Sequence, residues 1–289
     1  MNWTKSFNCP GVVGQDVVAL LRAALSKAGV TNVCVVAVLN DTTGTLVAGA
    51  AQDPACCLGL ILGTGTNASY LEQSERVVRW GDCDPPQPGS QVIIDPEFGA
   101  FGDNGCVDFI KTEWDRAVDR GSLLPGSFTY EKYFAGKYLG ELVRLVFLSC
   151  CAELGEETPL GLARPDSLPT SAVSALVAGR DPELPAPLPP ALLAVLTHVA
   201  RLLSERAALL VAVPVAGLLS RVSHRARAVV AVTGSLYRLH PTLASRLAHH
   251  SARLTSVPHT YQLCQDGSGR GAGLIAAIAT RLHTEGSVL

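Results

Sequence analysis

Two short apolar runs, each followed at once by a polar turn, constrain the fold of this chain more than any other feature. Residues 33–39 and 58–62 are rich in branched apolar side chains and too short for typical helices, so we predict two buried strands. The sequence Asn-Asp-Thr-Thr-Gly-Thr follows the first run, and Gly-Thr-Gly-Thr-Asn follows the second. Open α/β sheets bind ligands beyond the carboxyl ends of their strands. We therefore expect both polar segments to border one cleft.

Each polar segment has a chemical interpretation and a plain structural one. Asp41, at the end of the first predicted strand, is a candidate general base that accepts a proton from a substrate hydroxyl. An Asx turn or a helix cap is the alternative. The glycines around Thr64 allow close backbone approach to phosphate oxygens, but β-hairpin turns use the same residues.

The rest of the chain alternates between helical and strand-like patterns, which is typical of an α/β fold. We predict helices over 16–28 and 130–154, one or two helices over 191–219 interrupted at Pro214, a strand over 228–232, and a glycine-rich loop at 267–271 that opens a helix to residue 283. Residues 164–190, rich in Pro, Ser and Ala, are expected to form a divergent surface region or loop.

Composition indicates a globular chain of one or two domains. The 289 residues are 48% hydrophobic and 17% charged with a net charge of −2, which does not favour a nucleic-acid partner. The longest uncharged apolar stretch, 207–220, is too short to span a bilayer, and the N-terminus lacks a signal-peptide pattern. The nine cysteines show no metal-binding spacing, so we expect no metal site and reduced, mostly buried thiols.

Several collinear blocks resemble the hexokinase family, glucokinase included. The match covers nearly the whole chain and is faint only between residues 152 and 234. Besides the two polar segments, the matching blocks are residues 2–5, 96–102, 130–132, 136–144, 234–241 and 266–272. The resemblance implies the actin-like (ribonuclease H-like) α/β fold, with a mixed sheet flanked by helices.

The resemblance also implies a sugar site. Asp41 matches the family's catalytic base, which removes the proton of the sugar 6-hydroxyl. The positions that match contacts to the sugar are Thr4, Lys5, Asn40, Asp41, Asn67, Glu97 and Glu131. Carboxylates and amides suit a polyol because a wrongly placed hydroxyl leaves buried polar groups unpaired.

The resemblance also implies a nucleotide site next to the sugar site. The positions that match contacts to ATP are Gly63, Thr64, Gly65, Lys137, Thr170, Ser174, Ser235, Ser268 and Gly269. Thr170 and Ser174 keep a family spacing in altered surroundings, so coincidence is the alternative there. Magnesium is expected to be carried mainly by the ATP phosphates. Thr233 and Gln265 depart from the acidic residues usual in the family.

The family's first phosphate loop, of the Asp-Leu-Gly-Gly-Thr type, has no match in this chain. We therefore expect a fold truncated at the N-terminus, with residues 1–52 as a remnant of the N-terminal region and 53–289 as the large domain. The implied function is ATP-dependent phosphorylation of glucose or a related hexose at the first step of glycolysis, in the cytosol. A catalytically impaired sugar-binding or regulatory fragment, or an incomplete gene model, is the alternative. Some relatives attach to mitochondria through an N-terminal segment that is not expected here.

Overall fold

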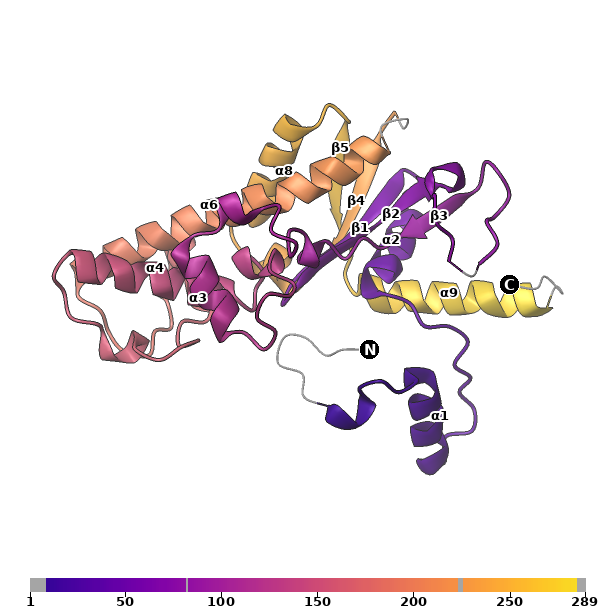
Figure 1. The fold of residues 1–289 in the computed structure, drawn as a ribbon, viewed down its shortest axis with the longest axis horizontal. Coiled ribbons are helices and arrows are strands. Elements are labelled where there is room, and N and C mark those ends of the chain that lie inside the picture. Colours follow the sequence, from indigo (N-terminus) through magenta and orange to yellow (C-terminus); the bar gives the residue numbers. More distant parts are fainter. Residues whose placement is uncertain (1–8, 82, 223–225, 285–289) are drawn as a thin grey trace.

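A five-stranded mixed sheet forms the centre of the computed structural model, which describes residues 9–81, 83–222 and 226–284. The strands are β1 (Cys56–Leu62), β2 (Thr66–Gln73), β3 (Gln91–Ile94), β4 (Ala228–Thr233) and β5 (His259–Leu263). Their order across the sheet is β3-β2-β1-β4-β5 (Figure 1). β1, β2 and β3 are antiparallel neighbours, whereas β4 runs parallel to both β1 and β5. The α/β class and the mixed sheet are as predicted.

Strands β1 and β4 were predicted from their apolar runs. Their burial in the sheet explains why these runs are apolar. β1 and β4 have helices on both faces, so side chains on both sides are apolar. Val230 and Val232 pack into the main core with Leu58 and Leu60. On the opposite face Val229 and Ala231 pack with Leu46.

Helices α2 (Asp41–Gln52) and α9 (Gly267–Thr284) cover one face of the sheet, and they pack against each other. In Figure 1 they lie beneath the strands. α9 begins at Gly267 itself, so the predicted glycine-rich loop is wrong: those glycines form the first helical turns. Gly271 allows this approach, because a Cβ there would overlap the backbone carbonyl of Gly44 in α2.

The other face carries a larger helical layer. It comprises α3 (Glu113–Gly121), α4 (Leu139–Glu153), α5 (Thr170–Val177), α6 (Pro190–Arg221), α7 (Ser235–Leu239) and α8 (Leu243–Leu254). The long helix predicted over 130–154 starts only at Leu139, since a short 3₁₀ turn, Glu131–Tyr133, precedes it. The loop predicted over 164–190 contains α5, whose Val173 and Leu176 are buried in the core. The Pro-rich composition of residues 164–190 favoured a loop, so the sequence did not predict this short buried helix.

α6 is continuous through Pro214, contrary to the predicted interruption. A proline inside a helix costs about 3 kcal/mol, and contacts with α4, α5 and α8 along its length offset that cost. Within the described residues α6 is the one helix long and apolar enough to cross a membrane, by length and composition only. The uncharged stretch within it, 207–220, remains too short to span a bilayer, as expected. Half of the most apolar window of α6 is buried inside the fold, which explains its composition by packing.

The N-terminal described segment, from residue 9 to 40, is attached far more loosely. Helix α1 (Val17–Lys27) forms where predicted, with Asp16 as its N-cap, but none of its described residues is buried. Residues 33–39 are neither helix nor strand, and Val33 and Val38 are 54% and 62% exposed. The predicted buried strand is therefore wrong here: in the described structure the segment pairs with no strand of the sheet. Branched apolar side chains favour a strand only when a neighbouring strand and a core exist.

The cysteines are less buried than expected. Four lie in the interior (Cys56, Cys57, Cys151, Cys264), one is half-buried (Cys150) and four are exposed (Cys9, Cys34, Cys83, Cys106). Burial raises the pKa of the Cys56 thiol to about 12, which keeps that side chain protonated and unreactive.

Candidate active site

Asn40 and Asp41 form the N-terminus of α2. The Asn40 side chain is the helix cap: its Oδ1 accepts hydrogen bonds from the backbone N–H and the hydroxyl of Thr42, at 2.9 and 2.7 Å. Asp41 is the first helical residue and is exposed. The positive end of the helix dipole stabilises a carboxylate at this position. The cap was thus a correct alternative for Asn40, while Asp41 stays available to solvent as a candidate base.

A chain of hydrogen bonds joins three of the predicted sugar-binding residues. Asn40 Nδ2 donates to Glu97 Oε1 at 3.1 Å, and Asn67 Nδ2 donates to Asp95 Oδ1 at 2.8 Å. The same Asp95 oxygen accepts the backbone N–H of Glu97 at 3.2 Å. Asn67 comes from β2, Asp95 and Glu97 follow β3, and Asn40 caps α2. The network therefore brings side chains from three elements to one place.

Glu131 lies beside this network but deeper. It is 1% exposed, and its Oε2 accepts the backbone N–H of Thr66 at 3.1 Å. The same oxygen lies 3.5 Å from the Cβ position of Gly99, two residues after Glu97. Glu131 thus lies buried next to the segment that follows Glu97.

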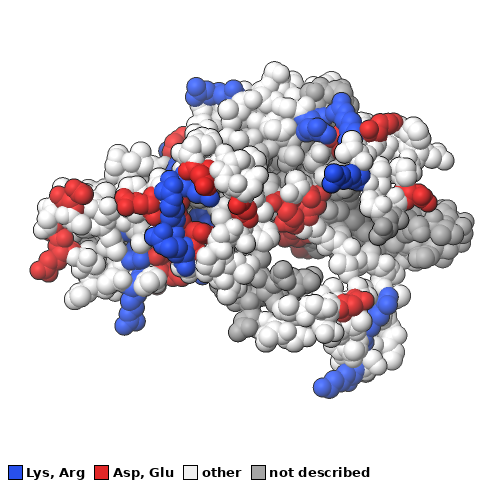
Figure 2. Space-filling model, in the orientation of Figure 1, with Lys and Arg blue, Asp and Glu red and all other residues white. Residues whose placement is uncertain are grey.

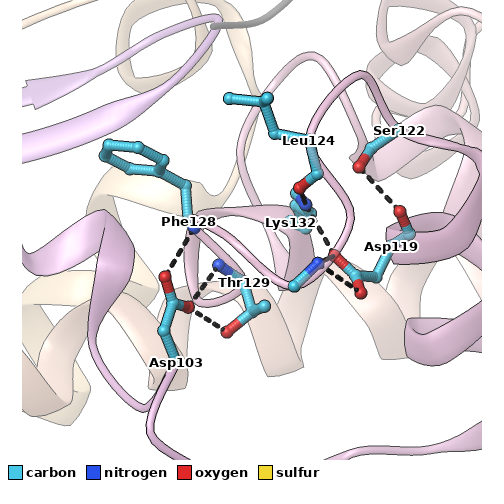
Figure 3. Close-up of polar contacts among 8 residues, drawn as sticks. Asp103, Asp119, Ser122, Leu124, Phe128, Thr129 and Lys132 are labelled. Carbon is cyan, nitrogen blue, oxygen red and sulfur yellow. Dashed lines mark hydrogen bonds and ion pairs between the residues drawn. The ribbon is translucent and has the colours of Figure 1, made fainter. Parts of the chain in front are cut away.

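Polar contacts on both sides hold the segment that carries Glu131 (Figure 3). Lys132 Nζ lies 2.6 Å from Asp119 Oδ1 and donates to the Leu124 carbonyl at 2.7 Å. Asp103 accepts the backbone N–H groups of Phe128 and Thr129. These bonds fix the chain on both sides of residue 130 and thereby hold Glu131 in place.

The Gly63–Gly65 segment is the tight turn of the β1–β2 hairpin, as the structural alternative predicted. Leu62 pairs with Thr66 across it, and the Gly63 N–H donates to the Gly65 carbonyl at 3.0 Å. The turn is tied to the start of α4, since the Gly136 N–H donates to the Gly63 carbonyl and the Lys137 N–H to the Thr64 carbonyl.

A cavity of about 600 Å³ opens beside this turn. Five predicted nucleotide-binding residues line it: Thr64, Lys137, Thr170, Ser174 and Ser235. Arg180 and Arg238, which sequence reasoning missed, line it as well. None of the described residues that line it is acidic, so its lining holds three cations and several hydroxyls, although Asp166, outside the lining, lies 4.0 Å from Lys137 Nζ. Such a lining suits a polyanion.

Two of these hydroxyls also have structural partners. Thr170 Oγ1 donates to the Gly136 carbonyl at 2.8 Å and accepts the Gly140 N–H at 3.1 Å. Ser174 Oγ donates to the Thr170 carbonyl at 3.1 Å. Thr170 therefore fastens α5 to the segment that carries Lys137, in addition to lining the cavity.

His240 closes the inner wall of the cavity and is neutral. The Ser204 hydroxyl donates to the Ala200 carbonyl, so it accepts from His240 Nε2, 2.9 Å away. The Thr242 N–H points to His240 Nδ1 at 3.4 Å, which agrees with an Nε2–H tautomer. Burial lowers the pKa of His240 to about 4.

Ser268 and Gly269 do not reach this cavity. They lie in the first turn of α9, where Gly269 faces the Asp266 carboxylate. Asp266 and Gln265 line a neighbouring cavity of about 270 Å³, which shares Ser235 and Arg238 with the first one. Thr233 replaces the expected acid there and donates from Oγ1 to the Cys264 carbonyl at 3.0 Å, joining β4 to β5.

Thr4 and Lys5 lie outside the described residues. Over 9–81, 83–222 and 226–284, no group of three or more His, Cys, Asp or Glu side chains is arranged to hold a metal ion. Asp95 could have been found from sequence, because it follows the apolar end of β3 just as Asn40 and Asp41 follow an apolar run. Arg180 and Arg238 carried no such signal.

Charges on the face seen in Figure 2 are interspersed, and no patch of a single sign covers it. This distribution differs from the continuous basic face typical of nucleic-acid binding.

Two family models, both described as hexokinase, match residues 1–51 and 57–278. Human Hexokinase-1 is 39% identical over 98% of the chain, and mouse Hexokinase-1 is 38% identical over the same share. This chain spans only 32% and 30% of the length of those relatives, or about a third.

Solved structures extend the comparison to the fold. A Schistosoma mansoni hexokinase complexed with glucose superposes with a TM-score of 0.86 at 34% identity, over 96% of this chain and 65% of that one. A Streptomyces griseus glucokinase of the ROK family, 16% identical, superposes with a TM-score of 0.51 over 90% of this chain and 72% of that one, which shows a common fold alone. Family models, relatives and structures agree: the chain belongs to the hexokinase family.

Proposed function

We propose that this chain binds a hexose beside Asn40, Asn67, Glu97 and Glu131, binds ATP in the 600 Å³ cavity, and transfers the γ-phosphoryl group to the sugar 6-hydroxyl. The β1–β2 hairpin turn carries this proposal. Thr64 lines the cavity, while two residues later the Thr66 N–H bonds to Glu131, and Asn67 bonds to Asp95. One tight turn therefore joins a polyol-type site to a polyanion-type site.

The reaction needs one proton transfer and one phosphoryl transfer. Asp41 accepts the proton of the sugar 6-hydroxyl while the hydroxyl oxygen forms a bond to the γ-phosphorus. The bond from that phosphorus to the bridging oxygen of the β-phosphate breaks, and ADP leaves with the electron pair. The products are hexose 6-phosphate and ADP, with the proton on Asp41.

The cavity residues have a matching role in this proposal. Lys137, Arg180 and Arg238 would balance the charge of the phosphates, and the Thr64 turn would approach them through its backbone. Magnesium bound to the ATP phosphates would neutralise the charge that develops on them. Because the cavity lining has no acidic residue among those described, we expect the ion to arrive with the nucleotide.

The relatives support glucose as the hexose. The schistosome hexokinase is described in complex with glucose and aligns over nearly all of this chain. We therefore infer glucose or a closely related hexose, the first step of glycolysis as the context, and the cytosol as the location. The division into residues 1–52 and 53–289 likewise stays a prediction.

A second candidate function is sugar binding without efficient turnover. The loose attachment of residues 9–40 favours it, because Asp41 directly follows this segment and is exposed. Phosphoryl transfer requires that water be excluded from the reacting groups. A regulatory or sugar-binding fragment would need only the hydrogen-bond network around Asp95.

Calorimetric titration of the purified chain with glucose tests the proposal. Titrations with and without a magnesium–ATP analogue, followed by coupled measurement of glucose 6-phosphate, separate binding from turnover. Saturable binding with product formation supports the kinase, and binding without product supports the second function. A folded sample that binds neither glucose nor nucleotide would contradict both.

A further inference from the structure

Asp95 stands at the centre of the polar network, although the family resemblance gave it no role. It follows the last residue of β3 and is half-buried. One oxygen, Oδ1, accepts both the side-chain N–H of Asn67 and the backbone N–H of Glu97, at 2.8 and 3.2 Å. Hydrogen bonds to a charged acceptor are stronger than neutral ones.

The first bond fixes the amide of Asn67. Asn67 Oδ1 accepts the backbone N–H of Ala68 at 2.8 Å, while Nδ2 points to Asp95. Both ends of the amide are thereby assigned, because a flipped amide would place its oxygen against the Asp95 carboxylate. Asn67 is 8% exposed, so its direction is set within the wall of the site.

The second bond supports an unusual backbone. Glu97 has φ +48°, in the left-handed region that non-glycine residues rarely adopt. The bond from its N–H to the side chain two residues earlier forms an Asx turn, which favours such a reversal. This conformation places the Glu97 carboxylate where it accepts a hydrogen bond from Asn40.

We propose that Asp95 is a positioning residue that sets the directions of Asn67 and Glu97 and so determines which arrangement of hexose hydroxyls the site accepts. The proposal rests on the hexose site proposed above. Asp95 acts through its neighbours: it aligns one amide and one carboxylate from different strands, as groups behind a binding site commonly do.

Three variants separate geometry from charge and from general stability. Asp95→Ala removes both bonds. Asp95→Asn keeps an oxygen that accepts both bonds but removes the charge. Asp53→Ala is the control for the loss of an Asx turn elsewhere: Asp53 accepts the Ala55 N–H at 2.9 Å at the start of β1, and it also pairs with Arg227 at 2.8 Å.

Glucose and its 2-, 3- and 4-deoxy analogues are titrated into each variant, with thermal melting as a check of folding. We expect Asp95→Ala to bind glucose about tenfold more weakly, the effect of one lost hydrogen bond to a charged group. The preference for glucose over at least one deoxy analogue should fall with it. Asp95→Asn and Asp53→Ala should keep that preference.

Two outcomes with folded variants overturn the proposal. A uniform loss of affinity for all sugars would show a purely structural role, and unchanged preference in Asp95→Ala would show no role. If Asp95→Ala does not fold, Asp95→Ser replaces it, because a serine hydroxyl still supports the turn at Glu97 but is too short for Asn67. Absence of glucose binding by the parent chain would overturn the hexose site as well, which distinguishes the two failures.

Discussion

The two sides of the candidate site are held in opposite ways. The nucleotide side is built on β1, β4 and the start of α4, where Leu60 and Val232 are fully buried. The side that ends at Asp41 follows residues 9–40, whose helix α1 has no buried residue. Figure 1 shows α1 set apart from the sheet.

This contrast separates binding from catalysis. Groups on the sheet keep their geometry because moving them would disrupt the core. Groups that depend on a loosely packed segment keep it only when a ligand or further contacts order them. We therefore expect affinity to depend on the sheet side and turnover to depend on the order of the Asn40–Asp41 side.

Substitution of Asp41 should have the largest effect. Asp41→Ala removes the proposed base, so kcat is expected to fall by about 10²- to 10⁴-fold, while glucose affinity changes little. Coupled production of glucose 6-phosphate measures the rate, and calorimetry measures the affinity. Asp53→Ala, at the opposite end of α2 from Asp41, serves as the control. Equal rates for Asp41→Ala and the parent would remove Asp41 from the mechanism.

A paired truncation tests the contrast in packing directly. Leu60→Ala creates a cavity in β1, and the free energy of unfolding should fall by about 2–5 kcal/mol. Leu21→Ala in α1 should change it by about 0.5 kcal/mol or less, because that side chain is 49% exposed. Urea unfolding measures both. A similar loss in the two variants would show that α1 is packed in solution and would end the comparison.

The same contrast explains which parts of the fold could be predicted. The runs at 58–62 and 228–232 are apolar on both faces because helices cover both sides of β1 and β4. The run at 33–39 carries the same local signal but has no neighbouring strand in the described structure. The local sequence indicates only that a segment prefers extended backbone. Whether a partner strand is present depends on other parts of the chain.

Tertiary packing also decided the helices that the sequence misplaced. α6 passes through Pro214 because three helices pack along it. α5 forms inside a segment rich in Pro and Ser because Val173 and Leu176 fill the core. These outcomes depend on distant residues, which a local pattern does not contain.

Within the site, residues at the ends of strands were predictable and residues brought in by distant segments were not. Asn67 and Thr64 follow β1 along the chain, and Asp95 carried a signal of the same kind. Arg180 follows α5 and Arg238 lies in α7, so their approach to Thr64 depends on tertiary folding. The resemblance supplied the remaining roles.

A pH titration probes the inner wall of the cavity. The pKa of His240 is lowered by burial from 6.5 to about 4, so the unfolded chain binds more protons than the folded one between those values. Stability should therefore fall as pH decreases through this window, by roughly 3 kcal/mol from this side chain. Urea unfolding at several pH values measures the fall. In His240→Gln the slope should be shallower, and an unchanged slope would assign the effect to other groups.

Substitutions at the contact between α2 and α9 test whether the activity of Asp41, at the start of α2, depends on how α2 packs against α9. Gly271→Ala places a Cβ against the Gly44 carbonyl, so the helices must separate, and we expect a loss of about 1–3 kcal/mol in stability together with lower kcat. Gly273→Ala, two residues away with open space around it, should stabilise the helix by about 0.5–1 kcal/mol. Loss of activity in both variants would point to the helix itself and away from its contact with α2.

Removal of Arg180 should have the smallest effect and the most specific one. Arg180→Gln takes one of three cations from the cavity wall, so affinity for ATP should fall about tenfold while affinity for adenosine stays the same. The difference should shrink as salt concentration rises, because exposed charges are screened. Arg201→Gln, on the exposed side of α6, is the matched control. If adenosine binding also weakens, Arg180 supports the base or ribose. If ATP binding is unchanged, Lys137, Arg238 and the hairpin turn hold the phosphates without Arg180, and the affinity of the nucleotide side comes from groups next to the buried sheet.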